Sequence, residues 1–209
     1  MLIPLSILAV FFSTSLLLTL APGPDNIFVL TQSALRGRLA GWVITLGLCT
    51  GLIGHTLLVS SGVAVIFQAS PLAFTSLKLA GGAYLLYLAF LAFRSSATKL
   101  SPSENGGASL FQLYRRGIIM NMTNPKVSIF FLSFLPQFAD PERGALMLQI
   151  VTLGFVFIIS ALMVFGMISL FSGYLGGRRQ QSPKAQNIMN RIAAIVYMAL
   201  AVKLIGAEM

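Results

Sequence analysis

Six long stretches of apolar residues, separated by short polar segments, account for most of the chain. The stretches cover residues 2–35, 39–69, 72–93, 117–138, 145–175 and 192–206. A helix needs about 20 apolar residues to cross a bilayer. The pattern therefore predicts six membrane-spanning helices. Because the last stretch is short, we expect its helix to begin earlier, near Ile188.

Composition places the chain in the membrane as well. Hydrophobic residues make up 56% of it, charged residues 9%, and the mean hydropathy is +0.87, whereas a soluble domain carries roughly 25% charged residues. We predict an all-α integral membrane protein with one transmembrane domain over residues 1–209. Within that domain we distinguish a first half of about 1–93, a polar loop at 94–116 and a second half of about 117–209.

The first apolar stretch contains a break. Residues 2–35 would form a helix about 50 Å long, which is too long for one upright span. The break falls at Pro22, Gly23 and Pro24, where two prolines remove backbone donors and glycine permits unusual backbone angles. We expect Asp25 and Asn26 to cap a helix that restarts at residue 27.

Such a break has a functional interpretation. Lipid cannot solvate broken backbone, so a break at membrane depth must line a cavity or be buried in protein. In transporters such breaks often form the substrate site. The alternative for the first break is a capped turn at the membrane surface that binds no ligand.

A second break lies near the middle of the fourth stretch, at Asn124, Pro125 and Lys126. Counted from Gly117, Lys126 lies about 13 Å into the span. A lysine at that depth must be paired, deprotonated or placed in a wet cavity, and Pro125 frees the carbonyl of Asn121 from its helical hydrogen bond. The alternative is a span that starts later, with Lys126 extending to the membrane surface.

Three other features of the second stretch complete the candidate chemistry. Gly47, Gly51 and Gly54 form a flat stripe on which another helix can lie closely. The single histidine of the chain, His55, lies beside this stripe and is either a proton relay or a packed neutral side chain. The single cysteine, Cys49, rules out a disulfide within the chain and is most simply a small core residue.

Basic residues alternate between successive loops. The segments after spans one, three and five carry several lysines and arginines, the turn after span two carries none, and the one after span four carries only Arg143. This pattern predicts that the basic loops face the cytoplasm and that both termini face the periplasm. The net charge of +9 thus orients the protein in a membrane and does not indicate nucleic-acid binding.

The two halves also show a weak internal repeat, since Ser15–Pro22 resembles Ser128–Pro136. Three spans per half is an odd number, so the two halves must be inverted relative to each other. Inverted repeats are a common design of alternating-access carriers, and in this chain we expect two inverted three-helix repeats with interrupted helices one and four.

Several function classes find no support in the sequence. It contains no motif of a soluble hydrolase, of a zinc protease or of a nucleotide-binding P-loop, so we expect no catalytic residues, no cofactor and no metal centre. A thiol-relay redox protein would need paired cysteines, and an intramembrane enzyme would need a catalytic constellation that one histidine hardly allows. A carrier for another small metabolite or a metal ion remains the alternative within transport.

Three separated motifs point to a known family. They comprise Ala21–Asn26 with Arg36–Gly41, then Leu77–Leu85, and then Asn124–Lys126 with Phe130–Phe131 and Pro136–Phe138. In order and spacing they resemble the lysine exporter (LysE/RhtB) family of amino-acid exporters. The resemblance covers nearly the whole chain.

This resemblance implies a secondary-active exporter of an amino acid or derivative in the bacterial inner membrane, driven by the proton motive force. The central site would then comprise Pro22–Asn26 and Asn124–Lys126. In this hypothesis Asp25 orders the gate or the ligand, and Lys126 neutralises a substrate carboxylate or Asp25. Asp25 and His55 are the candidates for proton coupling, and the glycine stripes allow a homodimer as well as internal packing.

Overall fold

The computed structural model describes residues 2–69, 71–95, 108–175 and 183–206. All regular elements in these ranges are helical, which confirms the all-α prediction. In chain order they are α1 (Leu5–Leu20), α2 (Pro24–Arg36), α3 (Arg38–Ala69), α4 (Pro71–Arg94), α5 (Leu110–Met122), α6 (Pro125–Ile129), η1 (Phe130–Phe134), η2 (Leu135–Phe138), η3 (Pro141–Arg143), α7 (Leu146–Leu175) and α8 (Pro183–Ile205).

The helices form about six candidate spans. α3, α4, α7 and α8 each contain a segment long and apolar enough to cross a membrane alone. The other two spans are bent pairs. α1 and α2 meet at 62°, and α5 meets the segment Pro125–Phe138 at 49°. Spans one and four are therefore the interrupted ones, as the sequence predicts.

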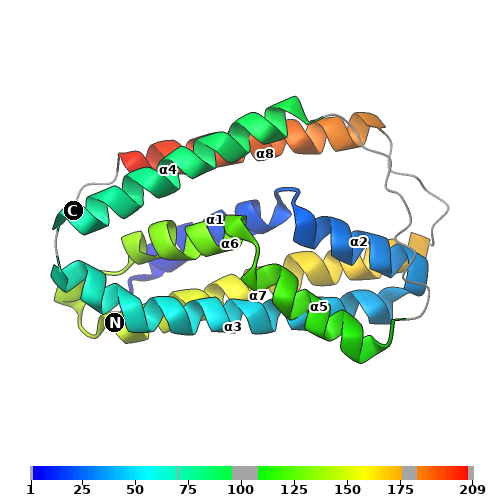
Figure 1. The fold of residues 1–209 in the computed structure, drawn as a ribbon, viewed down its shortest axis with the longest axis horizontal. Coiled ribbons are helices and arrows are strands. Elements are labelled where there is room, and N and C mark those ends of the chain that lie inside the picture. The colour runs from blue at the N-terminus through cyan, green and yellow to red at the C-terminus, as the bar shows by residue number, and fades with distance from the viewer. Residues whose placement is uncertain (1, 70, 96–107, 176–182, 207–209) are drawn as a thin grey trace.

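The spans run alongside one another, so the connections gather at two ends of the molecule (Figure 1). α2, α4 and α7 end, and α3, α5 and α8 begin, at one end, which we call the basic end. α1 begins and α8 ends at the opposite end, which we call the terminal end. The predicted basic segments therefore share one end, as far as the described residues show them. Which end faces the cytoplasm stays a prediction.

Two helices begin earlier than the sequence predicts. α5 starts at Leu110, inside the expected polar loop, because the side chains of Ser109 and Gln112 each accept a hydrogen bond from the other's backbone N–H. This capping box supplies partners for donors that a helix start leaves free. α8 starts at Pro183, where proline is well suited to the first helical turn.

The glycine stripe on α3 serves close helix packing, as predicted. A Cβ atom at Gly51 would lie 2.7 Å from Oδ1 of Asn121, and one at Gly54 would lie 2.8 Å from the sulfur of Met122. Both of these neighbours belong to α5. Glycine lets α3 and α5 approach until backbone and side chain touch. This contact holds the second break against α3.

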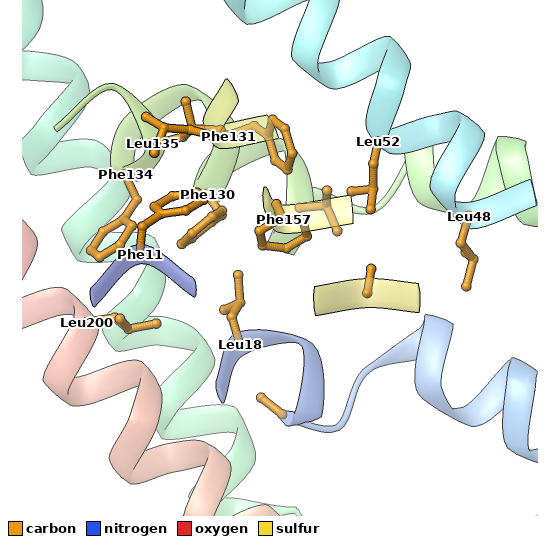
Figure 2. Close-up of a cluster of buried hydrophobic side chains, with 14 of the residues drawn as sticks. Phe11, Leu18, Leu48, Leu52, Phe130, Phe131, Phe134, Leu135, Phe157 and Leu200 are labelled. Carbon is orange, nitrogen blue, oxygen red and sulfur yellow. The ribbon is translucent and has the colours of Figure 1, made fainter. Parts of the chain in front are cut away.

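The terminal half of the molecule is filled by an aromatic cluster that comprises Phe11, Phe130, Phe131, Phe134, Phe138 and Phe157. Figure 2 shows five of these rings beside Leu18 and Leu135. η1, which supplies three of them, is a π-helix, and η2 is a 3₁₀-helix. Wide and tight turns follow each other here because Pro136 cannot donate to the carbonyl four residues earlier.

Candidate functional site

The first break leaves backbone acceptors free at the end of α1. In a continuous helix the carbonyl of Leu18 would accept from residue 22 and that of Leu20 from residue 24. Both positions are proline, which has no N–H to donate. The chain therefore exposes carbonyl oxygens, at the negative end of the α1 dipole, inside the protein.

The side chain of Lys126 binds these exposed carbonyl oxygens. Its ammonium donates to the carbonyl of Ala21 at 2.9 Å and to that of Leu18 at 3.2 Å, and the side chain is only 8% exposed. Asn26 contributes in the same way by donating through Nδ2 to the carbonyl of Thr19 at 2.7 Å. Lys126 is thus buried at the break, so the alternative of extension to the membrane surface does not describe this structure.

The predicted capping roles of Asp25 and Asn26 are wrong. α2 begins at Pro24, and Gly23 is its N-cap residue without a side-chain cap. Proline takes the first helical position because its φ is already suitable and its missing donor costs nothing there. Asp25 lies in the first turn of α2, where the positive end of the helix dipole favours a carboxylate.

Gly23 also plays a different part from the one predicted. Its φ is −167°, which is extended backbone open to any residue. A Cβ atom at this position would lie 3.3 Å from Nζ of Lys126. Glycine is therefore explained here by the closeness of the ammonium group and not by an unusual backbone angle.

The second break occurs where the sequence predicts it. Asn124 is the N-cap residue of α6, and its Oδ1 accepts from the backbone N–H of Lys126 at 3.0 Å. Pro125 occupies the first helical position. The carbonyl of Asn121, freed by Pro125, accepts from the N–H of Asn124 at 3.0 Å and lies 3.2 Å from Nε2 of His55. Because a carbonyl only accepts, Nε2 of His55 is the donor.

Asn121 joins the two breaks, and the candidate residues named from the sequence did not include it. Its Nδ2 donates to Oδ2 of Asp25 at 3.2 Å, while its backbone carbonyl binds His55. The signal available in the sequence was its place four residues before Pro125. One residue thus connects α2, α3 and α5.

Asp25 and Lys126 belong to one buried site but do not form a direct ion pair. The direct ion pair found among the described residues instead joins Asp140 to Arg143 in the turn before α7. Asp25 is 3% exposed and is bonded by Asn121, whereas Lys126 is bonded by backbone. Tyr197 of α8 closes the site, because its ring centre lies 6.0 Å from Nζ of Lys126 and its hydroxyl donates to Pro22 at 3.5 Å.

Four buried polar atoms at the two breaks have no protein partner. They are Oδ1 of Asp25, Oδ1 of Asn26, Oδ1 of Asn121 and Nδ2 of Asn124. A buried polar atom left unpaired costs about 1–3 kcal/mol. A small polar ligand that offers both donors and acceptors would satisfy them. The geometry thus brings together every residue of the two predicted motifs, with His55 joined through Asn121.

Comparisons with known proteins agree with the motifs. The family model of the LysE type translocators matches residues 16–207 of this chain. A membrane protein of Vibrio cholerae is 30% identical over 199 residues, which are 95% of this chain and 96% of the relative. The homoserine/homoserine lactone efflux protein of Salmonella typhimurium is 30% identical over 207 residues and 95% of each chain.

The leucine efflux protein of Salmonella choleraesuis is 27% identical over 200 residues, which are 91% of this chain and 90% of the relative. No solved structure gives a significant match. The family match covers both breaks, begins at residue 16 within α1, and reaches into every candidate span. This multi-pass membrane protein therefore belongs to the LysE type translocator family.

Proposed function

We propose that the protein is a secondary-active exporter of an amino acid or amino-acid derivative, with its substrate site at the two breaks. The observation that carries this proposal is the buried site itself, where a lysine ammonium, an aspartate and four unpartnered polar atoms meet in a translocator fold. Efflux proteins for homoserine and for leucine among the relatives support the same substrate class.

The site suits a zwitterion. A substrate carboxylate would take the ammonium of Lys126 and the Nδ2 donor of Asn124. A substrate ammonium would take the acceptors Asp25, Asn26 and Asn121, whose Oδ1 atoms lack protein partners. A metal cation would find the carboxylate, but it would also meet the positive charge of Lys126. The combination therefore favours an amino acid over the alternative of a metal ion.

The architecture supports alternating access by two inverted halves. α3 packs against α7, and α4 against α8, so equivalent helices of the two halves contact each other. α3 runs from the basic to the terminal end, and α7 runs the opposite way (Figure 1). Both broken spans meet near the middle. This is the arrangement in which rocking of one half against the other exposes a central site to each side in turn.

The inner membrane is the compartment that fits this role, with the basic end in the cytoplasm. Arg36, Arg38, Arg94 and Arg115 lie at or near the basic end among the described residues, and basic loops are retained on the cytoplasmic side. The termini would then be periplasmic. Export would proceed from the basic end to the terminal end.

Counterflow in proteoliposomes tests the site. Vesicles are loaded with unlabelled homoserine or leucine, and uptake of the labelled compound is followed. We expect Lys126→Met and Asp25→Asn each to lower the exchange rate by more than about tenfold, because each removes a charge that binds one end of the substrate. Wild-type rates in both variants would show that the site is elsewhere.

Two surface variants serve as matched controls. Arg115→Met and Glu142→Gln make comparable charge changes at exposed positions, and we expect both to exchange normally. Thermal stability in detergent, measured with a panel of amino acids, identifies ligands without transport, because a bound ligand raises the unfolding temperature. A panel in which no amino acid stabilises the protein, combined with absent counterflow, would overturn the proposed function.

Proton coupling would use the hydrogen-bonded chain from His55 through Asn121 to Asp25. Protonation of Asp25 would weaken the bond from Asn121, and protonation of His55 at Nδ1 would strengthen the bond from its Nε2–H to Asn121. We expect His55→Gln to retain counterflow, which needs no gradient, and to lose accumulation driven by a pH gradient. Normal gradient-driven accumulation in this variant would remove His55 from the coupling step and leave Asp25 as the titrating group.

A further inference from the structure

Gln32 of α2 is a buried polar side chain that neither the fold nor the two breaks explain. It is 2% exposed, and its Oε1 atom has no protein partner. Of the six buried polar atoms without a protein partner among the described residues, four lie at the breaks and the other two are Oε1 of Gln32 and Oγ1 of Thr31. α2 thus carries buried polar atoms without protein partners beyond the break itself.

Helical geometry places Gln32 on the same side of α2 as Asp25. Seven residues separate them, which is nearly two full turns and about 10 Å along the helix axis. α2 runs from the break to the basic end (Figure 1). Gln32 therefore lies along α2 between the central site and the basic end.

Ser33 and Ser169, two buried hydroxyl side chains toward the basic end, have partners already, whereas Oγ1 of Thr31 does not. Ser33 donates to the carbonyl of Val29 at 2.6 Å, and Ser169 of α7 donates to the carbonyl of Phe165 at 2.8 Å. Hydroxyls bonded to their own helix need nothing from a ligand. Gln32 differs from Ser33 and Ser169 because its carboxamide oxygen is buried and unpaired. A polar ligand that donates to this oxygen would remove the free-energy cost of leaving it unpaired.

We propose that Gln32 is a substrate-contacting residue that recognises a hydrogen-bonding side chain of the exported amino acid. This inference rests on the proposed function, in which Asp25 and Lys126 hold the ammonium and carboxylate. With those groups fixed at the breaks, the substrate side chain that points toward the basic end approaches Gln32. A hydroxyl or amide there pairs with the carboxamide, whereas a methyl group leaves it unpaired.

The predicted substrate class is therefore a small amino acid with a polar side chain. A site built to pair with a substrate hydroxyl rejects the analogue without it, because the buried partner in the protein is then left unsatisfied. Homoserine and norvaline are a suitable pair of probes, since they have nearly the same shape and differ by a hydroxyl in place of a methyl group. We expect the wild-type protein to prefer homoserine by at least about tenfold.

The test measures counterflow of both probes, and their stabilisation of the detergent-purified protein, in wild type and in Gln32→Met. Methionine keeps an unbranched side chain of similar length but cannot pair with a hydroxyl. We expect the variant to lose the preference for homoserine and to transport norvaline at least as well as wild type does. Ser33→Ala, next to Gln32 on α2, should keep the preference.

The outcomes separate the role of Gln32 from the function of the protein. A Gln32→Met protein that still prefers homoserine as wild type does overturns the role of Gln32, as does a wild type without preference. Absence of any amino-acid exchange in wild type overturns the proposed function and this inference together. If Gln32→Met does not fold, Gln32→Leu supplies the same comparison, because leucine likewise has no group that pairs with a hydroxyl. It should lose the preference for homoserine, and a retained preference contradicts the proposal.

Discussion

The part of the bundle toward the terminal end and the part toward the basic end bury different groups. Toward the terminal end, six phenylalanines from α1, η1, η2 and α7 pack with ring centres 4.9 to 5.2 Å apart for the closest pairs. Toward the basic end, the buried positions include Gln32, Ser33, Thr45 and Ser169. Lipid gives helices no hydrophobic reason to associate, so close packing and hydrogen bonds must hold them. Buried hydroxyls such as those of Ser15 and Ser160, bonded to their own helices, occur toward the terminal end too. The two parts therefore differ in the ring cluster of the one and in the unpartnered carboxamide oxygen of Gln32 in the other.

This difference bears on the direction in which a substrate can move. The aromatic cluster offers a zwitterion no hydrogen-bond partner beyond Lys126, so passage toward the terminal end requires the rings to separate. The part toward the basic end offers the buried carboxamide oxygen of Gln32, which has no protein partner. We expect these packed rings to act as a seal on the terminal side. The π-helix η1 carries three rings of that seal, and such wide turns are frequent at functional sites.

The largest effect is expected from opening the aromatic cluster. Phe130→Ala removes a ring that contacts Phe11, Phe134 and Phe157. Replacing a buried phenylalanine by alanine costs about 3–5 kcal/mol, which would lower the unfolding temperature by about 10 °C. Phe155→Ala is the matched control, because that ring is 62% exposed on α7. If Phe130→Ala and Phe155→Ala lower the unfolding temperature in detergent equally, the aromatic cluster does not stabilise this part of the protein.

The contrast between the two parts also explains what could be predicted from the sequence. Pro22, Pro24 and Pro125 mark both breaks because a missing backbone donor is a local property that a sequence displays directly. The aromatic cluster could not be predicted, because its rings come from three distant segments. The same holds for the switch from π to 3₁₀ geometry around Pro136, which depends on what the turn packs against.

Residues whose role depends on a partner were the ones misassigned or missed. Asn26 looked like a helix cap, but Pro24 begins the helix, and the amide turns back to Thr19. Asn121 lay in a noted stretch, yet its contacts with Asp25 and His55 require α5 to lie on α3. The spacing of Gln32 from Asp25 was visible, but its burial was not.

The next largest effect is expected from displacing the side chain of Asn121, which links the two breaks. Gly51→Ala would place a Cβ atom 2.7 Å from Oδ1 of Asn121, which forces that side chain away from Asp25. We expect counterflow to fall by at least about tenfold, a change of 1.4 kcal/mol. Gly62→Ala changes the same helix where nothing lies within 4 Å and should leave transport intact. A normal rate in Gly51→Ala would mean that the Asn121 contact is dispensable.

A smaller effect is expected from loosening the basic end. Arg36, the last residue of α2, donates to the carbonyl of Ala108 just before α5 at 2.7 Å. Arg36→Ala removes this charged hydrogen bond, and because the side chain is half-buried we expect a loss near 1 kcal/mol, or about 2–4 °C in unfolding temperature. Arg38→Ala, at an exposed position, should shift it less. A shift as large as that of Phe130→Ala would contradict the proposed difference between the two parts.

The smallest effect is expected from Thr45→Val, although Thr45 is fully buried toward the basic end. Its hydroxyl donates to the carbonyl of Gly41 at 2.9 Å in its own helix, and the oxygen of Ser169 lies 3.4 Å away. Hydrogen bonds between membrane helices contribute about 0.6 kcal/mol on average, so the unfolding temperature should fall by no more than about 2 °C, with counterflow unchanged. Thr152→Val, which removes the same kind of self-contained bond at an exposed position, should show no shift. A loss of transport in Thr45→Val would mean that transport depends on the general polarity of this part of the protein. Normal transport in Thr45→Val together with altered selectivity in Gln32→Met would assign the effect on transport to Gln32, the side chain without a partner.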